Sequence, residues 1–112
     1  MEKNIENLLK RVSLFLEDGD WAKADEYCEK VLDQDPENAE AYLGKLMAEL
    51  HVRTRAELGK LSQDFGGYKN YQKALRYGDE ALQAELKDTQ ATARERADAV
   101  TKEAETKRKM LT

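Results

Sequence analysis

The sequence predicts an all-α protein built from antiparallel helical hairpins, with a long charged helix at its C-terminal end. Apolar residues recur at steps of three and four in several segments, the spacing that lines one face of a helix. Glycine and proline are scarce, with six Gly and one Pro in 112 residues, whereas an all-β fold needs many turn residues. Charged residues make up 38% of the chain, which favours exposed helices.

Length and charge limit the classes of function. A chain of 112 residues forms one small domain with a modest core. The formal net charge of -4 argues against nucleic acid as a partner, because such binding rests on an excess of Lys and Arg. No apolar run approaches the ~18 residues of a membrane span, and the first residues lack the apolar core of a signal peptide. We therefore expect a cytoplasmic protein without a membrane partner.

The first hairpin is expected from residues 5–16 and 21–34. Asn4 can cap the first helix, Gly19 can take the left-handed conformation that ends it, and Asp20 can cap the second. The apolar stripe of the first helix consists of Ile5, Leu8, Leu9, Val12, Phe15 and Leu16. That of the second helix consists of Trp21, Ala24, Tyr27 or Cys28, Val31 and Leu32.

A third helix is expected from about Glu37 to about Val52. Asp35 and Pro36 end the second helix, because the residue before a proline avoids the helical region and proline suits a first helical turn. Gly44 lies inside the third helix, where glycine costs about 1 kcal/mol relative to alanine. A close helix crossing is the simplest reason for it.

The segment after the third helix is expected to hold a short helix, a turn and a strong final helix. Thr54 and Glu57 have the spacing of a capping box, which predicts a helix over about 55–63, and Gly66 and Gly67 predict a turn. A continuous helix is then expected over 68–86. Residues 87–112 form a charged helical extension with a thin stripe of alanines, expected to project beyond the core.

Two parts of the chain repeat one another. The first and third helices align at an offset of 34 residues, from Leu8 to Tyr42. Trp21–Tyr27 aligns with Tyr71–Tyr77 without a gap, at an offset of 50 residues. About 16 residues are therefore inserted within the second unit, over about 53–67.

Residues 5–38 resemble a tetratricopeptide repeat. The positions that carry the resemblance are Gly19, Trp21, Ala24, Tyr27, Val31 and Pro36, followed by Tyr42 at the start of the next unit. The resemblance implies a helical domain over 1–86, with unit one over about 5–38 and an expanded unit two over about 39–86. The second unit departs from the pattern by its insertion, by Gly78 and by Leu86 at the place of the terminal proline.

The resemblance implies a concave groove that binds a peptide or helix of a partner protein. Its floor would be apolar and its lips acidic, which suits an apolar or basic segment. The groove residues would be Glu6, Leu9, Ser13 and Leu16 from the first helix, and Glu40, Leu43, Met47 and Leu50 from the third. Alternatively, the insertion or a second copy of the chain covers them. Leu9, Ser13 and Gly44 stand where some family members clamp a terminal carboxylate, and they cannot do so.

No pattern in the sequence predicts catalysis, a cofactor or a metal. His51 lacks a Cys, Asp or His at ligand spacing and is expected at a helix end or on the surface. Cys28, the only cysteine, lies in an apolar pattern between Glu26 and Glu29, which predicts a buried structural thiol. Tyr68, Tyr71 and Tyr77 are expected to face the core rather than to stack on nucleic acid bases.

Two functions remain. The first is a non-enzymatic interaction module or scaffold that binds a partner protein on its concave face. The second is a structural element that forms homodimers, or packs on a neighbouring domain, through its long C-terminal helix. Two hairpins bury few of their stacking surfaces, which is the physical reason for the second alternative.

Overall fold

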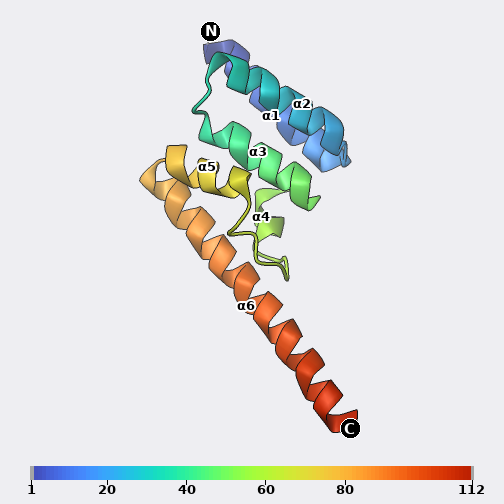
Figure 1. Cartoon of the computed structure of the whole chain (residues 1–112). Coiled ribbons are helices and arrows are strands. Elements are labelled where there is room, and N and C mark those ends of the chain that lie inside the picture. Colours follow the sequence, from blue (N-terminus) through green and yellow to red (C-terminus); the bar gives the residue numbers. More distant parts are fainter. Residues whose placement is uncertain (1, 112) are drawn as a thin grey trace.

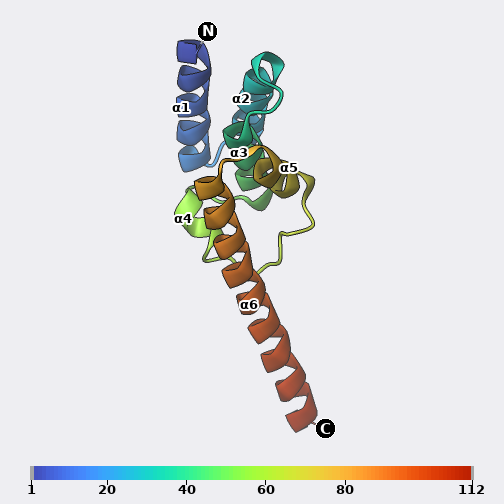
Figure 2. The ribbon, with the colours of Figure 1, turned by 90° about the vertical axis from the view of Figure 1, so that its left-hand side faces the viewer.

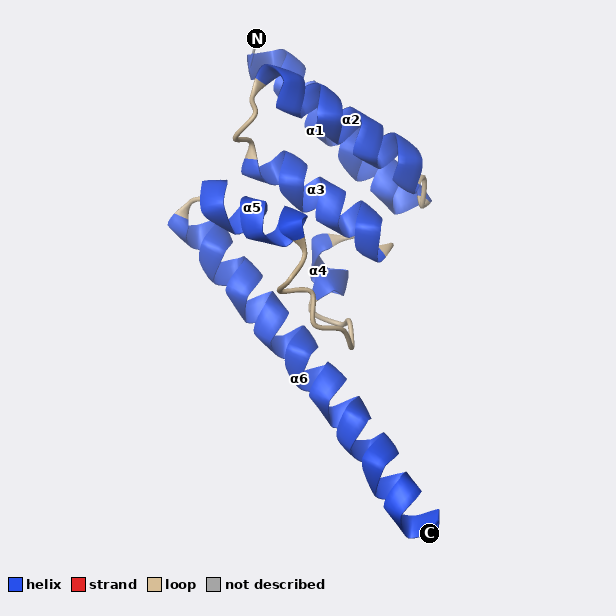
Figure 3. Cartoon of the chain, in the orientation of Figure 1, coloured by secondary structure: helices blue, strands red, loops and turns tan. Residues whose placement is uncertain are grey.

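The computed structural model describes residues 2–111, and the side chains of residues 4–102. All regular structure in the described part is helical, which confirms the all-α prediction (Figures 1 and 3). The elements are α1 (Glu2–Asp18), α2 (Trp21–Gln34), α3 (Ala39–Leu50), α4 (Arg55–Leu58), α5 (Lys69–Tyr77) and α6 (Glu80–Leu111). Along the chain, α1 packs on α2, α2 on α3, and α3 on α5, while α4 and its flanking loops lie outside this series (Figure 1).

The turn between α1 and α2 forms as expected. Gly19 has a φ of 75°, which an L side chain rarely adopts, and Asp20 Oδ1 accepts a hydrogen bond from the Lys23 N–H at 3.3 Å. The start of α1 differs from the expectation: Asn4 lies inside the helix and does not cap it. Glu2 and Lys3 are good helix formers, and nothing in the sequence prevents the helix from including them.

The helix α3 is shorter than predicted at both ends. It begins at Ala39 rather than near Glu37, because Asn38 Oδ1 accepts a hydrogen bond from the Ala41 N–H at 3.0 Å and so caps it. It ends at Leu50 rather than Val52, because His51 takes a left-handed φ of 56° and its N–H bonds back to the preceding turn.

Gly44 lies where α3 crosses α1 and α2, as the sequence predicted. A Cβ atom at this position would lie 2.7 Å from Cys28 Sγ and 3.0 Å from Val12 Cγ1. These neighbours belong to the continuous core of the protein, so they have little room to move. The largest fully buried side chains of that core are Phe65, Leu43, Leu46, Leu58, Leu86, Val31 and Cys28.

The continuous helix predicted over 68–86 is wrong. The chain bends at Gly78 and Asp79, which separate α5 from α6, and α6 turns back along α5 (Figure 1). Gly78 is extended, with a ψ of 156°, and Asp79 Oδ1 accepts a hydrogen bond from the Leu82 N–H at 2.8 Å. A second Gly-Asp pair, Gly19 and Asp20, separates α1 from α2. The sequence therefore contained a signal for the end of α5.

The insertion forms less helix than predicted but is firmly anchored. The helix α4 ends at Leu58 rather than near residue 63, since Gly59 follows it. Glu57 accepts a hydrogen bond from the Arg53 N–H at 3.0 Å, whereas the Thr54 side chain caps nothing, so the predicted capping box is incomplete. Phe65, near the end of the insertion, is fully buried, and its N–H donates to Gln90 Oε1 of α6 at 3.1 Å.

The helix α6 leaves the body of the molecule, as the charged extension was expected to do (Figures 1 and 2). The helix runs without a break across residues 86 and 87. Leu82, Leu86 and Ala93 are buried, so its first half packs on the protein. The hydrogen bond from Gln83 Nε2 to the Leu75 carbonyl, at 2.7 Å, fastens its base to α5. Val100, further along, is 54% exposed.

We predict that Gly44→Ala destabilises the protein by about 1 to 3 kcal/mol, because overpacking at Cys28 Sγ outweighs the gain in helix propensity. The midpoint of urea unfolding measures this. Gly67→Ala is the matched control, since nothing lies within 4 Å of a Cβ at that turn. In the Cys28→Ala background the cost of Gly44→Ala should shrink; an undiminished cost would contradict the crossing as its cause.

Candidate functional site

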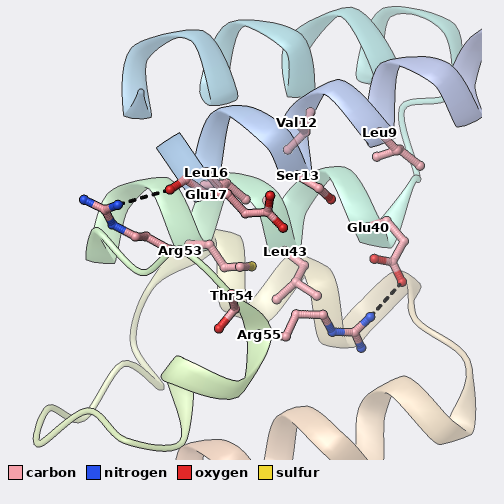
Figure 4. Close-up of a pocket in the computed structure, with 12 residues that line it drawn as sticks. Leu9, Val12, Ser13, Leu16, Glu17, Glu40, Leu43, Arg53, Thr54 and Arg55 are labelled. Carbon is pink, nitrogen blue, oxygen red and sulfur yellow. Dashed lines mark hydrogen bonds and ion pairs between the residues drawn. The ribbon is translucent and has the colours of Figure 1, made fainter. Parts of the chain in front are cut away.

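A cavity of about 250 Å³ lies between α1, α3 and the residues that follow α3 (Figure 4). Its floor is apolar, and Leu16, Leu43 and Met47 are themselves almost fully buried. Six of the eight groove residues predicted from the sequence line it: Leu9, Ser13, Leu16, Glu40, Leu43 and Met47. The second half of α1 and the first turns of α3 therefore face the same space.

Glu6 and Leu50, the other two predicted groove residues, do not line the cavity. Glu6 is exposed on the first half of α1. Leu50 is half-buried and packs against the core at the last position of α3. The cavity is thus shorter than a groove running the length of both helices, because the chain turns back across it directly after α3.

The insertion supplies the third wall of the cavity, through Arg53, Thr54 and Arg55. Arg53 donates from Nη1 to the Glu17 carbonyl oxygen at 3.1 Å, which ties the insertion to the end of α1 (Figure 4). Arg55 lies 3.7 Å from Glu40 Oε1 and also pairs with Glu85 of α6. These three residues were not predicted from the sequence, although they begin only three positions after the end of α3.

Three further residues complete the lining of the cavity. Val12 and Gly44 form part of the cavity wall, and Glu17 stands at its lip. The lips therefore carry both signs of charge, Glu17 and Glu40 with Arg53 and Arg55, where acidic lips alone were expected.

The size of the cavity suits a side chain better than a whole ligand. Small-molecule sites usually have volumes of about 300–1,000 Å³, and this one falls below that range. In residues 4–102 there is no group of three or more His, Cys, Asp or Glu side chains that could hold a metal ion. No helix in the described part of the chain is both long enough and apolar enough to cross a membrane.

Cys28 and Lys45 lie behind the cavity wall, next to Gly44. Burial, reinforced by the charge of Asp25, raises the pKa of the Cys28 thiol from 9.0 to about 12. Lys45 bonds to Asp25 at 3.0 Å and also pairs with Glu29. Partial burial lowers the pKa of Lys45, but the hydrogen bonds to Glu29 and Asp25 outweigh it and the net pKa is raised. The two ion pairs of Lys45 join α2 to α3, and burial keeps the Cys28 thiol neutral.

The other residues considered from the sequence lie away from the cavity. His51 is exposed and stacks on Trp21, with ring centroids 4.9 Å apart, so it joins α3 to the first hairpin. Tyr71 is buried and meets Phe65 edge to face, while Tyr68 and Tyr77 are half-buried. Tyr68 and Tyr71 pack on the core, as predicted, whereas Tyr77 packs against Tyr42, with ring centroids 5.8 Å apart.

Comparison with protein-family models, with curated proteins and with solved structures gave no match for this chain.

We predict that Cys28 in the folded protein reacts with iodoacetamide about a hundredfold or more slowly than in concentrated guanidinium chloride, at a pH near 8. A raised pKa leaves little thiolate at this pH, and full burial blocks access. Mass spectrometry of time points measures the rate. Equal rates in both conditions would show that the thiol is accessible and ionised in the native state.

Proposed function

We propose that this protein is a non-enzymatic interaction module of tetratricopeptide type, which binds a segment of a partner protein in the cavity between α1 and α3. The observation that carries the proposal is the cavity itself: an open apolar floor of the size of one large side chain, set among polar and charged lips. Binding pockets for single anchor side chains have this composition.

The order of packing supports the repeat type. The hairpin of α1 and α2 is followed by α3, which packs on both of them and then on α5. Trp21 in α2 and Tyr71 in α5, which align in the sequence repeat, both lie against the core. The insertion lies between α3 and α5 in the chain (Figure 1). The fold can therefore be described as two hairpins, α1 with α2 and α3 with α5, the second of which has an expanded connection.

The lips of the cavity offer hydrogen-bonding groups to a bound backbone. The hydroxyl groups of Ser13 and Thr54 line the cavity, and Ser13 is exposed. The Arg53 guanidinium is held by the backbone carbonyl of Glu17, and the Glu17 side chain extends away from it and also lines the cavity (Figure 4). An extended segment or a helix end with one apolar anchor fits this combination.

The test is a pull-down that compares variants at the cavity with a matched variant elsewhere on α1. Ser13→Arg changes an exposed residue and Leu9→Glu a half-buried residue at the edge of the core, so circular dichroism must show that both variants fold; Leu43, which is 1% exposed, would be a poor choice. We expect at least about a tenfold loss of partner recovery, because burying an apolar anchor is worth about 1.5–3 kcal/mol. Leu14→Glu is the control, since Leu14 is exposed and lies outside the cavity. Equal recovery by all variants would refute the proposed site.

A second function, assembly through α6, is favoured by one specific observation. Leu86, Ala93 and Val100 follow one another at seven-residue steps, the repeat that lines one face of a coiled coil. Leu86 and Ala93 are covered by the rest of the chain, whereas Val100 is 54% exposed. A second helix, from another copy or a neighbouring domain, would cover the exposed part of the stripe.

Sedimentation velocity at several protein concentrations tests this alternative. If α6 pairs between copies, the wild type should sediment as a dimer at high concentration. Val100→Glu should then shift the equilibrium to monomer by about tenfold or more, because it buries a charge in the seam. Ala99→Glu is the control, at an exposed neighbour on another face. A wild type that stays monomeric throughout would exclude pairing between copies.

A further inference from the structure

A hollow with acidic walls adjoins the cavity, and Glu40 and Arg55 line both. This hollow runs between the turn that precedes α3 and the turn that separates α5 from α6. It is here called the acidic trough, and its carboxylates are Asp35, Glu37, Glu40, Asp79 and Glu85. Arg55 is the one basic residue among the residues that line it.

Most of the negative charge in the trough is not neutralised. Asp35 and Asp79 accept hydrogen bonds from neighbouring N–H groups, which satisfies oxygens but brings no positive charge. Arg55 pairs with Glu40 and Glu85. Five carboxylates therefore face one guanidinium in the space next to the apolar cavity, and the local potential favours a further cation.

The ion pairs of Arg55 are exposed to solvent, so another cation can replace Arg55 in them. The side chains of Arg55, Glu40 and Glu85 are 44%, 50% and 51% exposed. Ion pairs between such exposed groups contribute little to stability. Arg55 comes from the insertion, so the chain itself places a cation between the cavity and the trough.

We propose that the cavity and the acidic trough together form one site for a protein segment in which a Lys or Arg lies close to the apolar anchor. Arg55 holds the place of the partner's cation and is displaced when the segment binds. This inference rests on the proposed function, and it adds the class of partner: an apolar residue within a few positions of a basic one. Glu40 belongs to the walls of both parts, so anchor and cation bind side by side.

The first experiment is selection of random 12-residue peptides, displayed on phage, against the whole protein. We expect the recovered peptides to share a large apolar residue with a Lys or Arg within a few positions. Binding of one such peptide, measured by fluorescence anisotropy, should weaken as salt rises, because exposed charge pairs are screened.

The second experiment measures the same peptide on variants. The double variant Glu40→Gln with Glu85→Gln should bind it about fivefold or more weakly. Arg55→Gln should bind it about threefold more tightly, because the internal competitor is gone. Glu26→Gln, an exposed change on α2 outside the trough, should leave affinity unchanged.

The outcomes separate this inference from the proposed function. The recovered peptides could lack a basic residue and bind equally well without Glu40 and Glu85, yet lose binding on Leu9→Glu. That result would overturn the role of the trough, while the proposed binding in the cavity would stand. Weaker binding by Arg55→Gln would overturn the place-holding role of Arg55. Failure to recover any peptide, or binding that survives Leu9→Glu, would overturn the proposed function and this inference together.

Discussion

The close approach of α3 to the first hairpin at Gly44 is the constraint on which the rest of the structure depends. Without a side chain at this position, the backbone of α3 comes within contact of Cys28 and Val12. One residue on, Lys45 reaches Asp25 and Glu29, so the rotation of α3 is fixed as well as its distance. Gly44 also forms part of the cavity wall. Gly44 therefore belongs both to the tight helix crossing and to the wall of the adjoining cavity.

Much of the fold could be predicted from local signals. The helix α2 has the predicted bounds, because a capping aspartate precedes it and an Asp-Pro pair follows it. The core-facing residues followed from the three- and four-residue spacing, which depends only on helix geometry. The errors occurred where two signals competed: Asn38 caps α3 in preference to Pro36, and Gly78 with Asp79 ends α5 within a strongly periodic stretch. Periodicity describes which face is apolar, and it does not show where the chain turns.

The candidate site likewise has a part that the sequence predicts and a part that it does not. Residues on α1 and α3 were predictable, since a repeat fixes which helix faces meet, and six of the eight expected residues line the cavity. The wall formed by Arg53, Thr54 and Arg55 was not, because their positions depend on long-range contacts of the insertion with α1 and α6. Such contacts join residues about thirty positions apart and leave no periodic trace in the sequence.

The attachment of α6 has a mechanical consequence. Two residues of α6 hold its base: Gln83 bonds to Leu75 of α5, and Gln90 bonds to Phe65 of the insertion. Two different parts of the protein therefore set the direction of the helix. Beyond Ala93 it extends through 18 more residues, or about 27 Å at 1.5 Å per residue. A slight tilt between the two points of attachment is therefore magnified at the far end. The direction in which the long helix projects therefore depends on how the insertion sits against α5.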